Sequence, residues 1–445
     1  MTNKSRKRFF LLPGIAMMSL HVCAQIDAHS DSIAAEQSLN PIVITGTGTF
    51  HRASNSPVSV QVITQKQLHD SGVSSLAEAL TKLTSGVTTM TNGMGTFFNM
   101  NGLSDDYVLI LENGQRVSGD DRMQRINISK VKRIEILGGS AGSLYGSEAM
   151  AGVINIITDD SKNDVSLQSF TQLASKGRFD QQIGADIRQG KLTSNTAYAH
   201  KKADNWQVAQ YDEFIVDGET VHRPTGRPMS QGFHSDNISQ KLQWTFSDAW
   251  SVYLRGNYYN HETDRPQNAQ YTSKVTKKND AYTYTTKQAY TYDIHHQSYL
   301  YGGGARWNPN KQVHVYADIY SDNAVSKYDY WATADEYSYE LTRKRTHYWN
   351  ESLRGIFRLA SWNKLSAGIE GIQETLSSQS DNIDYEQTNT YNAFAQEELS
   401  LAPWLEAVVG ARYTYNGNFG SHFTPSASLF AHIGALRLRA SYAGG

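Results

Sequence analysis

From about Asp164 to the end of the chain, apolar and polar residues alternate in runs of roughly ten residues. Strands of about 9 to 11 residues with one apolar and one polar face are typical of a transmembrane barrel. A soluble β-sandwich can have the same alternation, so the pattern alone leaves both folds open. The alternating apolar positions are Ile183, Ala185 and Ile187; Ile238, Leu242, Trp244 and Phe246; Trp250, Val252 and Leu254; Val313, Val315, Ala317 and Ile319; and Leu405, Ala407, Val409, Ala411 and Tyr413.

The connections between these strands distinguish the two folds. Alternate connections are very short, at Gly190-Lys191, Ser247-Asp248-Ala249, Asn308-Pro309-Asn310, Ser361-Trp362-Asn363, Ala402-Pro403 and Gly434-Ala435. Most of those between them are long and polar, at 202–234, 261–290 and 322–346, as at the periplasmic and extracellular rims of an outer-membrane barrel. Beside the short turns, where an interfacial girdle would lie, are Trp244, Trp250, Trp307, Trp362 and Trp404. The sequence therefore predicts a transmembrane antiparallel β-barrel over 164–445.

The number of strands indicates that this barrel is incomplete. About thirteen strands are expected here, whereas single-chain bacterial barrels have an even number. A barrel wide enough to hold an internal domain of about one hundred residues has about 22 strands. We therefore expect the N-terminal part of a barrel, with about nine strands and about 200 residues missing.

Residues 1–25 are predicted to be a signal peptide. A basic segment at 4–8 precedes an apolar stretch at 9–20, and small residues precede Gln25, which is the usual order of an export signal. Cleavage near Ala24 would remove the only cysteine, whereas a lipoprotein signal would make Cys23 the new N-terminus. The lipobox is poor, but this alternative stays open. No later segment approaches the roughly 18 apolar residues of a membrane-spanning helix.

Residues 26–56 are predicted to be a flexible segment that contains one short β-prone run. A polar tail without pattern at 26–40 leads into the run, which a Gly-Thr-Gly-Thr stretch follows. Such a run either begins the first strand of a domain or is an extended peptide that adds to the sheet edge of another protein. The run itself consists of Pro41, Ile42, Val43, Ile44 and Thr45.

Residues 57–160 are predicted to form a compact α+β domain. Thr64 with Gln67, and Ser75 with Glu78, have the spacing of capping boxes and predict two helix starts, the second helix ending at Gly86. Strands are expected at 58–62, 108–111, 133–137 and 153–158. The dipeptide Asn113-Gly114 predicts a hairpin turn after the second of these strands.

No residue pattern supports catalysis, a cofactor or nucleic-acid binding. The glycine-rich stretch 138–147 lacks the Lys that a phosphate-binding loop needs after Gly146, and common protease and hydrolase motifs are absent. A formal net charge of −2 gives no general attraction to nucleic acid. A haem or metal site at His295-His296 is the weaker alternative, because neighbours on a strand face opposite sides. We therefore predict that the protein is not an enzyme and has no resident metal.

Four segments of the predicted α+β domain resemble, in this order, the plug domain of TonB-dependent outer-membrane receptors. They are 108–114 (VLILENG), 133–139 (RIEILGG), 144–149 (LYGSEA) and 152–158 (GVINIIT). The resemblance extends over about residues 41–445 and is closest to the branch of cobalamin, haem and colicin I receptors. It implies a plug domain followed by a barrel in the outer membrane of a Gram-negative bacterium.

The resemblance also implies energised import. The family takes up scarce ligands such as iron chelates (iron-siderophore complexes), haem and cobalamin, driven by an inner-membrane complex that includes TonB. Residues 41–45 would be the TonB box, to which TonB adds as a strand. The implied partners are therefore TonB, one such ligand and outer-membrane lipid. The alternative is a plugged barrel that no longer transports and acts as a surface-binding protein or passive pore.

Two departures from the family pattern concern the latch between plug and barrel. The family usually has an Arg before a Gly in two plug motifs, where this chain has Asn101-Gly102 and Gly138-Gly139-Ser140. Because those arginines help to latch the plug in relatives, we expect a different or weaker latch here.

The segments that match the ligand-facing plug loops of relatives are 90–99 and 118–124. Phe97 and Phe98 could stack on a flat ligand. Asp120, Asp121 and Arg122 could bind a cation or polar groups of the ligand. The alternative for both segments is a solvated loop with one aromatic anchor.

Overall fold

The computed structural model describes residues 41–49, 51–92, 95–119, 121–139, 142–158, 163–205, 211–225, 232–264, 270–288, 291–332, 338–434 and 436–444. The predicted signal peptide and residues 26–40 lie outside this part. Among the described residues, no helix has the length and apolar character needed to cross a membrane. We call residues 51–158 the plug and the thirteen-stranded sheet that begins at Val165 the wall.

The plug is built on a mixed sheet of five strands in the order β3-β9-β10-β7-β8. β10 runs parallel to β7, and the other neighbours are antiparallel. Side chains of this sheet form one core with those of α2 and α3, in which Ile134, Ile154 and Leu80 are fully buried. The strands are β2 (His51–Arg52), β3 (Val60–Thr64), β4 (Val87–Asn92), β5 (Gly95–Met100), β6 (Leu103–Ser104), β7 (Val108–Glu112), β8 (Gln115–Arg116), β9 (Val131–Gly138) and β10 (Gly152–Thr158); the helices are α2 (Gln65–Asp70), α3 (Leu76–Leu83), α4 (Gly142–Tyr145) and the short 3-10 helices η1 (Ala53–Asn55), η2 (Asp105–Tyr107), η3 (Ile128–Lys130) and η4 (Ser147–Ala149).

Local sequence signals determine where the plug helices begin. Thr64 and Gln67 form the predicted capping box at the start of α2. At the start of α3, the Ser75 side chain accepts a hydrogen bond from the Glu78 N–H as predicted. This helix ends at Leu83, a few residues before the predicted stop.

Among the plug residues with a positive φ are Asn113, Gly114 and Gly152. Asn113 and Gly114 have φ of 53° and 80°, the left-handed pair that a tight hairpin turn needs, which confirms the predicted turn between β7 and β8. Gly152 has φ of 145°, and a Cβ atom there would lie 2.2 Å from the Leu137 carbonyl oxygen. Only glycine fits at this point, where β10 lies very close to the backbone of β9.

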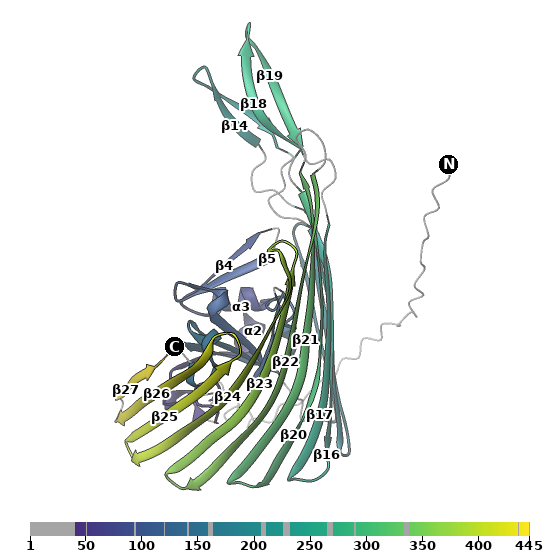
Figure 1. Ribbon diagram of the computed structural model, residues 1–445. Coiled ribbons are helices and arrows are strands. Elements are labelled where there is room, and N and C mark those ends of the chain that lie inside the picture. Colours follow the sequence, from purple (N-terminus) through teal and green to yellow (C-terminus); the bar gives the residue numbers. More distant parts are fainter. Residues whose placement is uncertain are drawn as a thin grey trace. The chain divides into compact units, whose positions relative to one another are not determined.

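The wall is one antiparallel sheet of thirteen strands, which confirms the predicted number. Figure 1 shows these strands following one another from teal to yellow. The sheet is not closed: β11 and β27 are its edges. In sheet order the strands are β11 (Val165–Ala174), β12 (Arg178–Gln189), β13 (Leu192–Ala203), β16 (Gly232–Thr245), β17 (Trp250–Asp264), β20 (Thr291–Asn310), β21 (Val313–Ala332), β22 (Ser338–Ala360), β23 (Asn363–Ser378), β24 (Ile383–Ala402), β25 (Leu405–Asn416), β26 (Gly420–Ile433) and β27 (Leu436–Ala443).

The two faces of the wall differ as the alternation predicts. On β12, Ile183 and Ile187 are exposed, whereas Gln182 and Asp186 between and beside them are buried. The predicted girdle tryptophans are all exposed, and two of them, Trp250 and Trp307, stack with ring centroids 5.8 Å apart. The apolar face is thus directed away from the plug.

The connections differ from the prediction in several places. Residues 308–310 belong to β20, so the turn lies at 311–312 instead. The expected loop at 322–346 is wrong for most of its length, because β21 and β22 stay paired up to Ala332 and Ser338. The other two long connections contain the hairpins β14 (Tyr211–Val216) with β15 (Glu219–Pro224) and β18 (Gln270–Lys278) with β19 (Ala281–Gln288).

Candidate functional site between plug and wall

Residues 41–45 lie docked as a short strand. β1 (Ile42–Val43) pairs antiparallel with β2 through Ile42 opposite Arg52 and Val43 opposite His51. Val43 is 1% exposed and belongs to an apolar cluster of the plug, whereas Ile42 is 51% exposed. Because only two residue pairs form this ladder, side-chain contacts must hold much of this segment.

A buried carboxylate of the plug sheet anchors the end of the strand. Glu135 Oε2 on β9 accepts hydrogen bonds from the Ile44 N–H and the Thr45 N–H, both at 2.8 Å, and from the Thr45 hydroxyl at 2.6 Å. Its other oxygen accepts from Arg133 Nε at 2.7 Å. Hydrogen bonds to an ionised group are roughly twice as strong as neutral ones. Glu135 is therefore the main polar anchor of residues 44 and 45.

Two further side chains complete the binding of Thr45. The Tyr145 hydroxyl donates to the Thr45 carbonyl oxygen at 3.0 Å, and Asn155 Nδ2 donates to the Thr45 hydroxyl at 3.1 Å. Burial raises the pKa of Tyr145 well above its ordinary value, so this hydroxyl stays a donor. Together with Glu135, these contacts bind every polar group of Thr45.

The residues after this strand are fixed to the wall by Glu398 on β24. Its carboxylate accepts hydrogen bonds from the Thr49 hydroxyl and from His51 Nε2, the latter at 2.9 Å. Two residues before Glu398 on the same strand, Gln396 Nε2 donates to the Thr47 carbonyl oxygen at 2.7 Å. The described part of the predicted flexible segment is thus bound to the plug on one side and to the wall on the other.

A buried ion pair joins the plug to β21. Arg125 donates from Nη1 and Nη2 to the two carboxylate oxygens of Asp322, each at 2.8 Å, and the Ser118 N–H donates to the same carboxylate at 2.9 Å. Burial lowers the pKa of Arg125, but Asp322 and then Asp121 outweigh it and leave this pKa raised. The guanidinium therefore stays charged and supplies a latch that the sequence did not predict.

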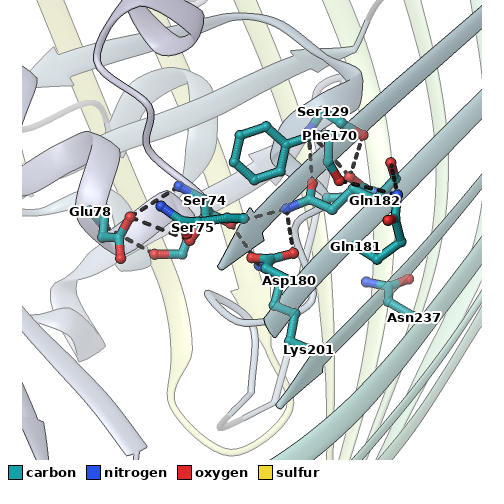
Figure 2. Close-up of polar contacts among 12 residues, drawn as sticks. Ser74, Ser75, Glu78, Ser129, Phe170, Asp180, Gln181, Gln182, Lys201 and Asn237 are labelled. Atoms are coloured by element: carbon teal, nitrogen blue, oxygen red, sulfur yellow. Dashed lines mark hydrogen bonds and ion pairs between the residues drawn. The ribbon is translucent and has the colours of Figure 1, made fainter. Parts of the chain in front are cut away.

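A second contact joins plug loops to β12 and β13 (Figure 2). Gln182, which is fully buried, accepts from the Ser129 N–H at 3.1 Å and donates to the Ser74 carbonyl oxygen at 3.3 Å. Lys201 donates to the same carbonyl at 2.6 Å and lies 3.5 Å from Asp180. This cluster binds plug backbone, so it fixes the position of two loops without depending on their side chains.

Ion pairs lie on both sides of this contact. Arg178 on β12 lies 2.7 Å from Glu78 on α3, and Lys130 of the plug lies 2.7 Å from Asp186. Burial raises the pKa of Glu78, but the N–H of Ser74 and the charge of Arg178 outweigh it and leave this pKa below its ordinary value. The latch of this protein is therefore distributed over several ion pairs.

A third contact lines a cavity of about 630 Å³ between plug and wall. Arg116 on β8 lies 2.7 Å from Glu148 of the plug and 2.8 Å from Glu374 on β23, with its guanidinium 4.5 Å from the centre of the Tyr348 ring. Burial raises the pKa of Glu148, and Arg116 offsets only part of this effect. The lining of this cavity is thus charged and aromatic, and Arg116 bonds to both the plug and the wall across it.

The structure places the described members of the predicted ligand set in different surroundings. Phe97 is exposed, whereas Phe98 is 2% exposed and belongs to the plug core. Successive residues of β5 face opposite sides, so one phenylalanine had to be buried, and we remove Phe98 from the candidate contacts. Asp120 lies outside the described residues.

The two remaining candidates are engaged elsewhere. Asp121 is buried, accepts from the Ser298 hydroxyl at 2.5 Å and lies 3.5 Å from Arg125 Nε, so it faces the wall and not a ligand. Arg122 Nη2 donates to the carbonyl oxygen and to Oδ2 of Asp105, at 3.0 and 3.2 Å. Of these two residues, Asp121 therefore contacts the wall and Arg122 is bound within the plug.

The histidine pair has separate partners. His295 Nε2 lies 2.8 Å from Asn260 Oδ1, and His296 Nδ1 lies 2.8 Å from the Ser326 hydroxyl. Within the described ranges, no group of three or more His, Cys, Asp or Glu side chains is arranged to hold a metal ion.

Sequence reasoning missed Glu135, Asn155 and Glu398. Glu135 and Asn155 interrupt otherwise apolar strands, and a polar residue in the middle of a buried strand is a signal that could have drawn attention to both. Nothing in the sequence connects Glu398 with residues 49 and 51, because the contact spans nearly 350 positions.

Comparison with known proteins follows the same division of the chain. The family model described as TonB-dependent Receptor Plug Domain matches residues 52–153, and that described as TonB dependent receptor-like, beta-barrel matches residues 175–445. The vitamin B12 transporter BtuB of Vibrio cholerae serotype O1 is 25% identical over 418 residues, which cover 91% of this chain and 62% of that protein. The iron-regulated outer membrane virulence protein of the same species is 24% identical over 434 residues, which cover 93% and 60%.

Solved structures share the fold. The ferric enterobactin receptor PfeA of Pseudomonas aeruginosa superposes with a TM-score of 0.66 at 16% identity, covering 88% of this chain and 62% of that one. The ferripyoverdine receptor of the same organism gives 0.65 at 11% identity, covering 90% and 58%. The chain therefore spans about three fifths of the length of the relatives that it matches.

Proposed function

Because the chain belongs to the family of TonB-dependent receptors, we propose that it serves in energised import of a scarce ligand across the outer membrane. The proposed ligand is an iron chelate, haem or cobalamin, since the relatives include a vitamin B12 transporter and ferric siderophore receptors. The exposed apolar face of the wall supports the proposal that its other partner is outer-membrane lipid.

We further propose that residues 41–45 are the TonB box. The observation that carries this is the mode of docking: a two-residue ladder, the buried Val43 side chain and the Glu135 carboxylate hold a short strand that is not part of the five-stranded plug sheet. A strand held in this way can leave the plug without disturbing the plug sheet, and TonB can then pair with its backbone. Ligand binding would shift the population toward the released state.

The test compares a backbone change with a side-chain change. Val43→Pro removes one N–H donor and fixes φ, so energised uptake should be lost while ligand binding to the complete receptor is retained. Ile42→Ala keeps the backbone and should leave uptake nearly normal. Cyanocobalamin, haem and ferric enterobactin are tried in turn as labelled ligands. Normal uptake by Val43→Pro would show that this segment is not the TonB box.

A further inference from the structure

One asparagine connects the docked strand with the hairpin β7–β8. Asn155 on β10 is 1% exposed. Its Nδ2 donates to the Thr45 hydroxyl at 3.1 Å, and its Oδ1 accepts from the Gly114 N–H at 3.1 Å. The two ends of one amide therefore bind residue 45 and the hairpin turn at the same time.

The turn continues directly into contacts with the wall. Gln115 donates to the Tyr253 hydroxyl at 2.8 Å, and Arg116 donates to Glu374 at 2.8 Å across the cavity described above. Gly114 is one residue from Gln115 and two from Arg116. A shift of these side chains against the wall therefore moves the Gly114 N–H, from which Asn155 Oδ1 accepts a hydrogen bond.

Strand register places Asn155 beside the anchor of the docked strand. Asn155 on β10 is paired with Glu135 on β9, so their side chains leave the sheet on the same face and both reach Thr45. An amide can accept from the turn while it donates to the threonine. A carboxylate at position 155 could only accept and would repel Glu135.

We propose that Asn155 is the positioning residue that couples Arg116 and the plug–wall cavity to release of residues 41–45. With the turn in place, the amide holds the Thr45 hydroxyl toward Glu135. When the turn moves, the buried amide oxygen loses its donor, and an unpaired buried acceptor is costly. The amide then follows the turn, and Thr45 loses a partner. This inference rests on the proposed role of residues 41–45 and deepens it by naming a residue that regulates their release.

The test measures strand release in the complete receptor without added ligand. A nitroxide label on Ile42→Cys reports the docked and released fractions by EPR, and the complete receptor without this substitution, carried through the same labelling, is the blank. Asn155→Leu should raise the ratio of released to docked strand by about 3- to 10-fold, since it removes the hydrogen bond to Thr45.

A matched control changes the same turn without touching this connection. Asn113 exchanges two hydrogen bonds with Thr158, at 2.8 and 3.0 Å, and has a left-handed backbone. Asn113→Gly removes both bonds and keeps the backbone accessible, so the release ratio should stay at the parental value.

The coupling itself is tested by a double-mutant cycle. Arg116→Gln should raise the release ratio about 2- to 5-fold in the parent and leave it unchanged in the Asn155→Leu background. Equal effects of Arg116→Gln in both backgrounds, or a parental ratio in Asn155→Leu, would overturn the proposal. If Asn155→Leu does not assemble, Asn155→Ser, which is too short to reach both partners, replaces it.

These outcomes are distinguishable from failure of the proposed function. The label reports release without TonB, so a parental ratio in Asn155→Leu together with loss of uptake in Val43→Pro refutes the coupling alone. Normal uptake in Val43→Pro refutes the proposed TonB box, whatever the label reports.

Discussion

Arg125 of the plug and Asp322 of the wall form a bidentate ion pair, in which the guanidinium donates two hydrogen bonds of 2.8 Å to the carboxylate. Both side chains are almost completely buried. The resemblance to the family leads one to expect latch arginines at Asn101 and Gly138, whereas the buried ion pair of this protein uses Arg125. The expected difference in the latch is thereby given a specific residue pair.

Removing one partner of this pair should loosen the plug strongly. Arg125→Met leaves the carboxylate of Asp322 buried without its counter-charge, which typically costs about 3 to 5 kcal/mol. Hydrogen exchange of plug amides in the complete receptor measures the free energy of local opening. Lys66→Ala breaks an exposed pair with Asp70 and should change that free energy by less than about 1 kcal/mol. Similar effects of both changes would contradict the role of Arg125.

The contact between α3 and β12 should weaken in acid. The pKa of Glu78 lies below its ordinary value in the folded protein, so its contribution to stability is present above the unfolded pKa of about 4.5 and is lost as the pH falls through the folded value. The protection factors of α3 amides, which compare each exchange rate with the intrinsic rate at the same pH, should therefore fall as the pH drops below about 4.5. In Glu78→Gln this acid-dependent step should be absent, and its persistence would assign the step to another group.

The two adjacent phenylalanines of β5 should behave differently. Phe98→Ala removes a ring from the plug core and should destabilise the plug by about 3 to 5 kcal/mol. Phe97→Ala should leave stability nearly unchanged, because its ring is exposed. If Phe97 contacts ligand, its removal should weaken binding by about 1 to 3 kcal/mol in the complete receptor, as measured by titration. Unchanged affinity would show that Phe97 does not contact the ligand.

Glu398→Gln should loosen residues 47–52 from the wall. The neutral amide cannot make charge-assisted bonds to Thr49 and His51, and the loss should speed tryptic cleavage after Arg52 by about 5- to 10-fold. Glu397→Gln is the matched control, because this neighbour bonds Asn363 and not the docked segment. Equal cleavage rates in the two variants would exclude Glu398 as the wall anchor.

The features that follow from local chemistry could be predicted from the sequence. The Thr64 cap, the left-handed Asn113-Gly114 turn and the alternation along β12 each depend on residues close together in the chain. The short connections lie mostly where expected for the same reason. Helix caps, turn residues and hydrophobic alternation all indicate the same architecture, so the fold class could also be predicted.

The functional contacts depend on distances that no local pattern encodes. Glu135 meets Thr45 across 90 positions, and the cross-strand register that places it beside Asn155 becomes visible only once β9 and β10 are paired. The polar composition of 322–346 is that of a loop, but the backbones of β21 and β22 remain paired through most of this range. Phe98 could not be distinguished from Phe97 because alternation does not say which face of a strand is buried.

The aromatic girdle also marks the depth at which the chain enters the plug. His51 and Trp362 line the same small pocket of about 280 Å³, so His51 lies at the level of the short turn that carries this exposed indole. Indoles settle at the boundary between hydrocarbon and water and thereby set the immersion depth of the wall. Under the proposed role of residues 41–45, the chain that follows them therefore passes the boundary between hydrocarbon and water at His51, where a periplasmic protein can reach it without entering the lipid.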